Sequence, residues 1–577
     1  MINKNSKIIV TGVKGQLGFD VVNELRSRGY TNVLGIDIEH LDITDEKAVD
    51  AFISHHKPEV VMHNAAWTAV DKAEQFEEKV YQVNSYGTRN IAKACKKVDA
   101  KMVYISTDYV FDGKGTTPFE VDSPKNGLSI YGKSKALGET FVQENLSKYF
   151  IVRISWAFGI NGANFVRTMI RVGANNKNLN VVCDQIGSPT YTFDLARLLV
   201  DMIETEKYGV YHATNEGFCS WADFARAIFA ETHMDVNVNP VTSEEYRKLA
   251  PNQAERPLNS RMSKSNLLEA GFEPLPTWQD ALHRYVKELK KKNMIPSRVL
   301  VTGANGYIGP HVVKALKDLG HTVIACDISE IKDDSVIKVE SSIFEKKNDP
   351  LKFYHYPDVV IHLAWRNGFN HSAPTHLDDL DAHYEFLKSM VDAGVQNIAV
   401  MGTMHEVGYY VGKIDENTPC NPLSNYGKAK KQLREKMLAL QKEKDFNLYW
   451  IRAFYITGSD SNNHSIFTKL LQAESEGKQT FPFTSGKNKY DFIDINELAK
   501  DIALISTQQE VKGIINACSG SPVSLAEMVE KFIKDNNLHL KLEYGAFPDR
   551  PYDSPEIYGD ISKLEVVLKD YENRSSN

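Results

Sequence analysis

Residues Lys7–Gly18 read KIIVTGVKGQLG, and residues Arg298–Gly309 read RVLVTGANGYIG. Each stretch is an apolar run followed by a Gly-x-x-Gly-x-x-Gly loop, the pattern of a strand that turns tightly into a helix. Three further segments recur at similar spacing: VVMHNAAW with VVIHLAW, MVYISTDYVF with IAVMGTMHEV, and SIYGKSK with SNYGKAK. Because such self-similarity indicates duplicated structural units, we predict two related domains of about 290 residues each.

The boundary between the domains is expected where a helical pattern ends in Lys290–Lys292 and Pro296 follows. Lysines suit the C-terminal end of a helix dipole, and a proline shortly afterwards stops a helix. We therefore predict domains at 1–293 and 294–577, joined as in a gene fusion, because Met294 would suit the start of a separate protein.

Short β-rich runs alternate with amphipathic helical patterns in each half. In the first half, strands are expected at 7–11, 33–37, 60–63, 102–106 and 150–154, and helices at Asp20–Arg28, Asp45–His56 and Ala73–Lys97. Such alternation predicts a parallel sheet covered by helices on both faces. The expected fold class is α/β, with two tandem Rossmann-type, doubly wound domains, each with a smaller C-terminal substrate-binding lobe, roughly at 160–290 and 455–570.

The composition of the 577 residues argues against several classes of protein. With 42% hydrophobic and 25% charged residues the chain is typical of a globular protein, and a net charge of −7 offers no basic excess for nucleic acid. No apolar run approaches the roughly 18 residues that span a bilayer, and the N-terminus lacks the apolar region of a signal peptide. The six scattered cysteines predict reduced thiols and a cytoplasmic protein, and no metal-ligand spacing is present. From the charge and the apolar runs we expect neither nucleic-acid nor membrane partners.

Both glycine loops are expected to bind a dinucleotide. Glycines permit a tight turn and a close approach to a pyrophosphate, which the N–H groups of the helix start then bind. Asp37 and Asp327 end the second strand of each half, where a carboxylate can accept hydrogen bonds from ribose hydroxyls. No arginine is adjacent to either, so we predict one NAD(H) or NADP(H) per half, with NAD(H) favoured. The alternatives are plain strand–helix turns and solvated aspartates.

Tyr131 and Lys135, like Tyr426 and Lys430, stand four residues apart at the start of a helical pattern. Residues at this spacing share one face of a helix, and an ammonium beside a phenol is expected to lower the pKa of the phenol. The tyrosine would then act as a general acid or base near neutral pH.

Thr107 and Thr403 stand at the ends of apolar strands upstream of these pairs, and with them the chain resembles the extended short-chain dehydrogenase/reductase family, once per half. The resemblance implies that the tyrosines are the acid/base residues, the lysines hold the nicotinamide ribose, and the threonines bind the substrate oxygen. It also implies a set of cofactor-binding residues, which are Gly12, Gly15, Gln16, Leu17, Gly18, Asp37, Asp42, Ile43, Asn64, Ala65 and Ala66 in the first half, and Gly303, Gly306, Tyr307, Ile308, Gly309, Asp327, Leu363 and Ala364 in the second.

The first half resembles, within this family, the dTDP-4-dehydrorhamnose reductases. The matching motifs are GQLG at 15–18, LDITD at 41–45, NAAWTAVDKAE at 64–74, STDYVFDG at 106–113, RISWAFG at 153–159, NFV at 164–166, DQIGSPTYTFDLA at 184–196 and RPLNSRM at 256–262. The resemblance implies hydride transfer to C4 of a dTDP-4-keto-6-deoxy-L-hexose, giving dTDP-L-rhamnose for surface polysaccharide. It implies substrate contacts by Asp108, Trp156, Asn164 and Arg256, whose alternative roles include a strand-end cap, a core side chain and a surface ion-pair partner.

The second half resembles NAD-dependent nucleotide-sugar epimerases and reductases, through YDFIDINELA at 490–499, NACSGSPVSLAEMV at 516–529 and DRPYDSPEIYGDISKL at 549–564. Met404 and His405 follow Thr403 where the related 4,6-dehydratases carry Asp-Glu, so dehydration is not expected. His405 and His464 are similarly placed to the Cys and His of GDP-fucose synthase and are candidate substrate residues. Simple 4-keto reduction, 4-epimerisation and enolisation by these histidines stay open, as does a plain pocket or surface role for each.

Two alternatives concern the chain as a whole. It could be a non-catalytic, dinucleotide-binding regulatory protein, or one active half with a structural partner half. Both Thr/Tyr/Lys sets are complete, which favours an enzyme in each half. The sequence is compatible with a homo-oligomer.

Overall fold

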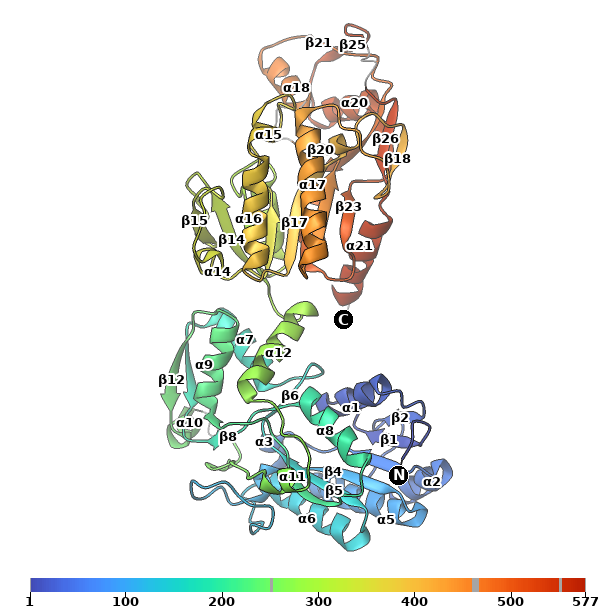
Figure 1. The fold of residues 1–577 in the computed structure, drawn as a ribbon, viewed down its shortest axis with the longest axis vertical. Helices are drawn as coiled ribbons and strands as arrows, with labels where there is room; N and C mark the ends of the chain where they lie inside the picture. The colour runs from blue at the N-terminus through green and yellow to red at the C-terminus, as the bar shows by residue number, and fades with distance from the viewer. Residues whose placement is uncertain (1, 250–252, 459–465, 549–552, 576–577) are drawn as a thin grey trace. The chain divides into compact units, whose positions relative to one another are not determined.

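The computed structural model describes residues 2–249, 253–458, 466–548 and 553–575. The chain forms two compact units, Met1–Leu289 and Lys290–Asn577. Each unit is built on a parallel sheet with helices on both faces (Figure 1), which confirms the predicted α/β fold class. Among the described residues, no helix is both long enough and apolar enough to cross a bilayer.

The first unit contains a six-stranded parallel sheet. Its strands, in spatial order, are β10 (Gly209–His212), β5 (Tyr149–Ile154), β4 (Lys101–Thr107), β3 (Val60–His63), β1 (Ile8–Thr11) and β2 (Val33–Ile36). The helices on one face are α1 (Gln16–Ser27) and α8 (Thr192–Ile203), and those on the other are α2 (Glu46–His56), α5 (Thr88–Val98) and α6 (Ile130–Asn145). Side chains alternate between the faces, so Ile8 and Val10 pack in the first layer and Ile9 in the second.

The second unit repeats this strand order and adds one strand at the outer edge. Its strands are β15 (Ile337–Glu340), β14 (Thr322–Asp327), β13 (Arg298–Thr302), β16 (Val359–His362), β17 (Asn397–Thr403), β19 (Asn447–Ala453) and β23 (Gly513–Ala517). One face carries α13 (Gly309–Asp318), α19 (Ile495–Thr507) and α21 (Ser562–Ser575), and the other carries α14 (Pro350–Phe353), α15 (Thr375–Asp378), α16 (Leu380–Asp392) and α17 (Asn425–Glu443).

Most of a smaller lobe follows β5 in the first unit and β19 in the second. The first lobe comprises α7 (Phe165–Asn175), α9 (Trp221–Glu231), α10 (Ser243–Leu249) and α12 (Trp278–Lys291), with the strand pairs β6/β9 (Ala157–Phe158, Thr190–Tyr191), β7/β12 (Asn178–Val182, Asn237–Val241) and β8/β11 (Ile186–Gly187, Cys219–Ser220). Helix α11 (Ser265–Glu269) packs instead against the core of the main sheet through Leu267. The predicted range 160–290 also holds α8 and β10, which belong to the main sheet layer. The lobe is therefore discontinuous in sequence.

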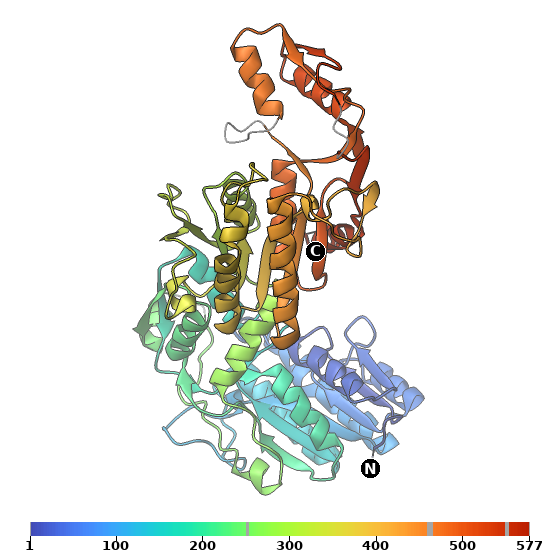
Figure 2. The ribbon, with the colours of Figure 1, turned by 45° about the horizontal axis from the view of Figure 1, so that its top comes forward.

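The second lobe lies beyond the carboxyl end of its sheet, as Figures 1 and 2 show for α18 (Ile466–Ser475) and α20 (Leu525–Asp535). Its strands are β18 (Gly412–Ile414), β20 (Tyr455–Thr457), β22 (Lys489–Asp494), β24 (Pro522–Ser524), β26 (Glu556–Gly559) and the pair β21 (Thr480–Pro482) and β25 (Lys541–Glu543). As in the first unit, the chain returns from this lobe to the main sheet, here through α19 and β23.

The predicted elements of the first half are found close to their expected bounds, with one correction. The single helix expected at Ala73–Lys97 is divided into α3 (Val70–Ala73), α4 (Glu77–Tyr81), a π-helical turn at Gln82–Gly87, and α5. The side chain of Asn84 lies in this turn, accepts a hydrogen bond from the Trp67 N–H and donates one to its carbonyl. These contacts with the loop after β3 account for the local widening of the helix, which periodicity alone does not show.

Candidate active site

The glycine loop of each unit turns directly against the end of a neighbouring strand. Gly12 and Gly303 have φ angles of +70° and +71°, in the left-handed region that strains other residues. A Cβ atom on Gly12 would lie 2.9 Å from the backbone of Ala65, and one on Gly303 would lie 2.7 Å from that of Ala364. Only glycine fits, and each loop leads into a helix, α1 or α13, whose first N–H groups are free to bind phosphate.

Asp37 and Asp327 stabilise the two glycine loops by hydrogen bonds. Each carboxylate accepts a hydrogen bond of 3.0 Å from a loop N–H, that of Lys14 in the first unit and of Asn305 in the second. Both aspartates are partly exposed, and the second oxygen of each accepts hydrogen bonds from the following residues, from the Ile38 N–H in the first unit and from the Ser329 N–H and hydroxyl in the second. The residues that the structure brings together here fit a dinucleotide in both units.

An exposed apolar side chain follows each of these aspartates. Ile38 is 72% exposed and Ile328 is 79% exposed, more than any other large hydrophobic side chain in the described ranges. An adenine ring could cover such a side chain, because burial of apolar surface is favourable. We did not predict this pair, although an apolar residue after a strand-end acid in both copies was a usable sequence signal.

The first unit also has a cation beside its aspartate. Lys14 Nζ lies 2.5 Å from Glu39 Oε1, whereas the equivalent Asn305 donates hydrogen bonds to Ser329 Oγ and the Glu330 carbonyl. The preference for NAD(H) rested on the absence of an adjacent arginine. A lysine can also form an ion pair with a 2′-phosphate. The expected preference for NAD(H) is therefore less well supported for the first unit than for the second.

Thr107, Tyr131 and Lys135 lie together at the carboxyl end of the first sheet. Thr107 is the last residue of β4, and Tyr131 lies in the first turn of α6, whose N-terminus is capped by the Ser129 hydroxyl. Lys135 follows one turn later and is buried. The three side chains therefore come from a strand end and a helix start that face the same edge of the sheet.

The second unit repeats this arrangement. Thr403 ends β17, and Tyr426 lies in the first turn of α17, which the Ser424 hydroxyl caps. Lys430 Nζ lies 5.9 Å from the centroid of the Tyr426 ring. Both candidate sets thus have the spacing and the structural setting that the sequence predicts.

The expected effect of the lysines on the tyrosines is wrong. Burial raises the pKa of Tyr131 and of Tyr426 to about 12, and interaction with the neighbouring threonine opposes only part of this rise. Burial also lowers the pKa of Lys135 and of Lys430 to about 7. Desolvation is the largest influence on the pKa of each tyrosine, so each is a protonated phenol at neutral pH and can donate a proton.

The two lysines have different neighbours. Lys135 Nζ lies 4.1 Å from the centroid of the Tyr104 ring. Lys430 Nζ lies 3.7 Å from the Trp365 ring and donates a hydrogen bond of 2.7 Å to the Met401 carbonyl. The lysine of the second unit is therefore held more firmly by its own fold.

Trp365 occupies the place that Ala66 holds in the first unit. The residues before them, Ala364 and Ala65, contact the equivalent glycines. The sequence similarity of NAAW and HLAW had instead matched Trp365 with Trp67. Because the loop after β16 is one residue shorter before the tryptophan, the indole lies beside Lys430.

Several residues of the predicted cofactor set have side chains that stabilise the fold. The side chains of Leu17 and Ile43 are buried in the two core layers of the first unit. Gln16 accepts a hydrogen bond from Asn164. Asn64 has a buried Oδ1 that no group in the described part of the chain satisfies, so it is the one of these four with an unused acceptor.

The remaining members of the predicted cofactor set lie close to the loops. Asp42 accepts hydrogen bonds from the backbone N–H and hydroxyl of Thr44, and so holds the turn after β2. Ile308 and Leu363 pack partly buried against the core of the second unit. Tyr307 lies in the glycine loop, and its ring centroid is 5.8 Å from that of Phe369.

Asp108 is the candidate substrate residue with the clearest unused capacity. Thr107 Oγ1 donates a hydrogen bond of 2.9 Å to its Oδ1, while its buried Oδ2 has no partner among the described residues. Burial raises the pKa of the Asp108 carboxyl to about 6. An unsatisfied buried oxygen beside Thr107 is suited to accept a hydrogen bond from a sugar hydroxyl.

Trp156 lies in a strained backbone conformation and is supported by a second indole. Its φ angle is +49°, and its ring stacks on that of Trp221 with centroids 3.7 Å apart. Trp221 Nε1 donates a hydrogen bond to Gln185 Oε1. Strain in a non-glycine residue is typical of functional sites. Trp221 was not predicted, because its contact with Trp156 depends on the fold of the lobe.

The other two predicted substrate residues of the first half have partners within the fold. Arg256 Nη2 lies 2.9 Å from both carboxylate oxygens of Asp71. Asn164 Nδ2 donates to the Gly159 carbonyl and to the Tyr285 hydroxyl, and its Oδ1 caps α7. Asn164 therefore stabilises the lobe, and Arg256 Nη1 is also bonded within the fold, to Gln253 Oε1 at 3.2 Å and to the Ala254 carbonyl at 3.3 Å.

A group of histidines surrounds the tyrosine of the second unit. The ring of His371 stacks on that of Tyr426 with centroids 5.0 Å apart, and it lies 4.4 Å from the ring of His405. His376 lies 5.2 Å from Tyr426. His371 and His376 were not predicted, because His371 lies in a loop without periodicity and His376 lies in the four-residue helix α15, which is too short to give a helical pattern. His464 lies outside the described residues.

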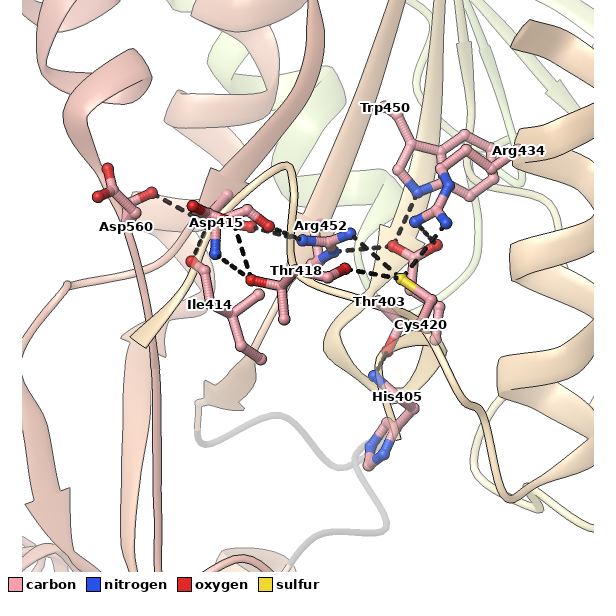
Figure 3. A network of polar contacts seen from close by, with 12 residues as sticks. Thr403, His405, Ile414, Asp415, Thr418, Cys420, Arg434, Trp450, Arg452 and Asp560 are labelled. Carbon is pink, nitrogen blue, oxygen red and sulfur yellow. Dashed lines mark hydrogen bonds and ion pairs between the residues drawn. The ribbon is translucent and has the colours of Figure 1, made fainter. Parts of the chain in front are cut away.

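A buried ionic network supports the segment that carries Thr403 and His405 (Figure 3). Glu406 ends the short 3₁₀ turn Met404–Glu406, and its Oε2 accepts a hydrogen bond of 2.7 Å from Arg434 Nη1. Its Oε1 accepts hydrogen bonds from Trp450 Nε1 at 3.0 Å and from Arg452 Nε at 2.9 Å. Three hydrogen-bond donors to the Glu406 carboxylate therefore fix the turn after β17.

The described part of the chain holds no group of three or more His, Cys, Asp or Glu side chains arranged to bind a metal ion.

The model of the family described as RmlD substrate binding domain matches residues 6–291. The model described as NAD dependent epimerase/dehydratase family matches residues 299–518.

Relatives of known function match one half of the chain over nearly their whole length. The dTDP-6-deoxy-L-talose 4-dehydrogenase (NAD(+)) of Aggregatibacter actinomycetemcomitans is 46% identical over 45% of this chain and 98% of its own. The dTDP-4-dehydrorhamnose reductase of the same organism is 39% identical over 48% of this chain and 97% of its own. The crystal structure of the dTDP-4-dehydrorhamnose reductase of Bacillus anthracis in complex with NADP is 42% identical, covers 49% of this chain and 99% of that chain, and has a TM-score of 0.48. The chain therefore belongs, through its N-terminal half, to the family of the dTDP-4-dehydrorhamnose reductases, and its C-terminal half resembles the NAD dependent epimerase/dehydratase family.

Proposed function

We propose that the N-terminal half reduces the 4-keto group of a dTDP-linked 6-deoxy-L-hexose with NADH or NADPH. The observation that carries this proposal is the Thr107, Tyr131 and Lys135 set, placed at the carboxyl end of a sheet beside a dinucleotide-type glycine loop. Support comes from 46% and 39% identity with a 4-dehydrogenase and a reductase of dTDP-sugars. A nucleotide sugar for polysaccharide is the expected product.

The residues of the chain position the ketone and supply the proton. A bound reduced nicotinamide would supply the hydride. Thr107 is placed to hydrogen-bond the ketone oxygen, and Tyr131, protonated at neutral pH, donates its proton to that oxygen as the alcohol forms. Lys135, one turn behind, is placed to hold the nicotinamide ribose.

The configuration of the product has two candidates. L-Rhamnose and 6-deoxy-L-talose differ only at C4, so they require hydride delivery to opposite faces of the same ketone. The 46% identity with the 6-deoxy-L-talose enzyme favours that sugar as the second candidate beside dTDP-L-rhamnose. The face is set by the groups that bind the sugar, for which Asp108 Oδ2 and the Trp156 ring are available. The proton coupling constants of the product at C4 distinguish the two.

The C-terminal half is assigned NAD(H)-dependent chemistry at C4 of a nucleotide sugar. Thr403, Tyr426 and Lys430 repeat the catalytic set, and Gly303 repeats the glycine cradle. Reduction of a 4-keto sugar and 4-epimerisation both fit, because an epimerase oxidises and re-reduces the same carbon. The first is the main candidate, since it is also the reaction assigned to the other half.

Separate Tyr131→Phe and Tyr426→Phe variants of the full chain test both assignments. With dTDP-4-dehydrorhamnose and NADH, we expect Tyr131→Phe to lower turnover at least about 100-fold, because the general acid is lost. Tyr426→Phe should keep that turnover and lower the turnover of the second half. Undiminished turnover of Tyr131→Phe would contradict the mechanism of the first half. Dinucleotide binding without turnover in the unsubstituted chain would favour a regulatory binding protein.

A further inference from the structure

Two imidazoles in the second unit lie against the catalytic tyrosine from different segments. His405 belongs to the 3₁₀ turn after β17, and its backbone N–H donates to Thr403 Oγ1 at 3.3 Å. The carbonyl of His371, from the loop before α15, accepts a hydrogen bond of 3.1 Å from the Tyr426 N–H. Both residues are thus fixed to the catalytic set through the backbone, and their rings lie 4.4 Å apart.

These two imidazoles differ from the other histidines around the site. His376 accepts a hydrogen bond from Trp365 Nε1 and donates one to the Asn370 carbonyl, so both its nitrogens have structural partners. By contrast, neither ring nitrogen of His371 or His405 has a hydrogen-bond partner in the described part of the chain. Half-buried imidazoles usually find partners within the fold. Two such rings with unused nitrogens at one site indicate that they face a bound molecule.

Their surroundings keep both rings neutral and fixed in place. Burial lowers the pKa of His405 to about 4 and also lowers the pKa of His371. In Figure 3 the ring of His405 points away from the ionic network that supports the turn. A neutral imidazole has one free lone pair and can accept a proton.

The first unit has no such pair. Tyr109 stands at the position of His405, and its ring meets that of Tyr131 edge-on with centroids 5.5 Å apart. The loop that corresponds to the one with His371 carries Asp71, which is paired with Arg256. A reductase set without the imidazoles is therefore present in the same chain, and it serves as an internal reference.

We propose that His371 and His405 form a second acid–base pair, which moves a proton at a carbon next to the keto group of a nucleotide 4-keto sugar. This inference rests on the function proposed above for the second half. It adds enolisation, and hence epimerisation at C3 or C5, to the hydride chemistry at C4.

The proton transfer is balanced without any redox step. An imidazole nitrogen takes the proton of the C–H bond, and the electron pair of that bond becomes the C=C bond of an enol. The carbonyl π electrons move to oxygen, which takes the phenol proton of Tyr426. Reversal returns a proton to carbon from the histidine pair, and in D₂O that proton is a deuteron. The group that loses its proton to carbon regains one from solvent.

The test measures deuterium incorporation into dTDP-4-keto-6-deoxy-D-glucose in D₂O, by mass spectrometry, without reduced cofactor. A Tyr131→Phe background silences the first half, and hydride transfer by the second half is measured in parallel as NADH oxidation. We expect exchange above a protein-free blank, and a ratio of exchange to hydride transfer that falls at least about tenfold in His405→Asn and in His371→Asn. His539→Asn changes an exposed histidine of the same unit and should leave the ratio unchanged.

Three results would overturn the inference. The first is an unchanged ratio in both histidine variants with wild-type thermal unfolding. The second is hydride transfer that depends on Tyr426 without any exchange. The third is an equal loss of exchange and hydride transfer, which would assign the pair to proton supply for Tyr426. If the Tyr131→Phe chain shows neither exchange nor hydride transfer, the proposed function of the second half fails as well, which distinguishes the two failures.

Discussion

The two units neutralise an equivalent buried arginine with carboxylates from different elements. In the first unit, Arg153 of β5 forms a two-pronged ion pair with Glu139 of α6, at 2.8 Å for both contacts. Glu139 also accepts a hydrogen bond from Ser106 Oγ and lies 3.4 Å from Lys125 Nζ. The carboxylate stands two helical turns after Tyr131, so the ion pair fixes the helix that carries the catalytic tyrosine.

In the second unit the helix position of Glu139 is held by Arg434, and the charge is reversed. The carboxylate comes instead from Glu406, at the position of Val110, and pairs with Arg434 and with Arg452 of β19. The indole of Trp450 supplies the donor that Ser106 supplies in the first unit. A Cβ on Gly402, the counterpart of Ser106, would collide with that indole.

This difference shows that the buried charge balance is kept while the anchored segment changes. In the first unit the carboxylate fixes the helix with Tyr131 and Lys135. In the second it fixes the turn with Thr403 and His405. This turn carries His405, to which we assign proton transfer. The ionic network therefore holds the turn in position for His405.

Removal of the carboxylate charge is expected to have the largest effect of the changes considered. Glu406→Gln leaves two buried guanidiniums without a counter-charge, whereas Glu139→Gln leaves Arg153 buried and Lys125 with its side chain 27% exposed. We expect Glu406→Gln to destabilise its unit by about 3–5 kcal/mol and Glu139→Gln to cost less. Hydrogen exchange of β17 and β19 against β4 and β5 measures the two losses separately. Equal losses would show that the second arginine is neutralised by other groups.

Substitution of the two lysines of the proposed catalytic sets is expected to have the next largest effect, and this effect depends on pH. The folded-state pKa of Lys135 and Lys430 is about 7, below the 10.5 of an unfolded lysine. Between these values the unfolded chain binds more protons, so stability rises with pH through this window, and the full penalty is present below pH 7. Lys135→Met should therefore stabilise the first unit by roughly 2–4 kcal/mol at pH 6, with a smaller gain at pH 9.

Lys430→Met sharpens this comparison. It removes the same penalty but also the hydrogen bond to the Met401 carbonyl and the contact with Trp365. A hydrogen bond from a charged group contributes about 1.5–3 kcal/mol, so the gain in the second unit should be smaller. Chemical denaturation at pH 6 and pH 9 gives both values. Equal gains would mean that these contacts do not stabilise the charged lysine.

The sequence predicts the parts of the site that local rules determine. Gly12 with Gly303, and Tyr131 with Lys135, lie where strand, loop and helix patterns place them, because periodicity and turn chemistry act over a few residues. The prediction of one continuous helix at Ala73–Lys97 was wrong at Gln82–Gly87. There the side chain of Asn84 bonds to the loop after β3, and the winding changes to a π-helical turn.

Contacts between segments that are distant in the sequence could not be predicted from these local patterns. The stacking of His371 on Tyr426 depends on the path of a loop without periodicity. The pKa of the tyrosine depends mainly on burial, which cannot be read from spacing. The exchange of Glu139 for Glu406 could have been noticed by a comparison of the two halves, because the charge at one helix position is reversed.

The arginine–carboxylate arrangement of the second unit can be introduced into the first unit by substitution of Val110 and Glu139. We expect a moderate coupling free energy between these two substitutions. Val110→Glu alone buries a new carboxylate beside Glu139, and Glu139→Arg alone leaves Arg153 facing a second cation. The double variant restores one carboxylate between two arginines, so it should be more stable than additivity predicts by about 1–2 kcal/mol. A double-mutant cycle from urea unfolding measures the coupling. Coupling near zero would show that Ser106 and Trp450 are essential parts of the two arrangements.

Cofactor preference is expected to change least. Lys14 of the first unit has no charged counterpart in the second, where Asn305 takes its place. Lys14→Asn should lower the ratio of kcat/KM with NADPH to that with NADH about two- to fivefold, the size of an exposed charge interaction. Glu39→Gln should raise the ratio, because Glu39 Oε1 holds the ammonium at 2.5 Å and its removal frees that charge for a 2′-phosphate. Identical ratios in both variants and in the unsubstituted chain would show that Asp37 alone determines the preference.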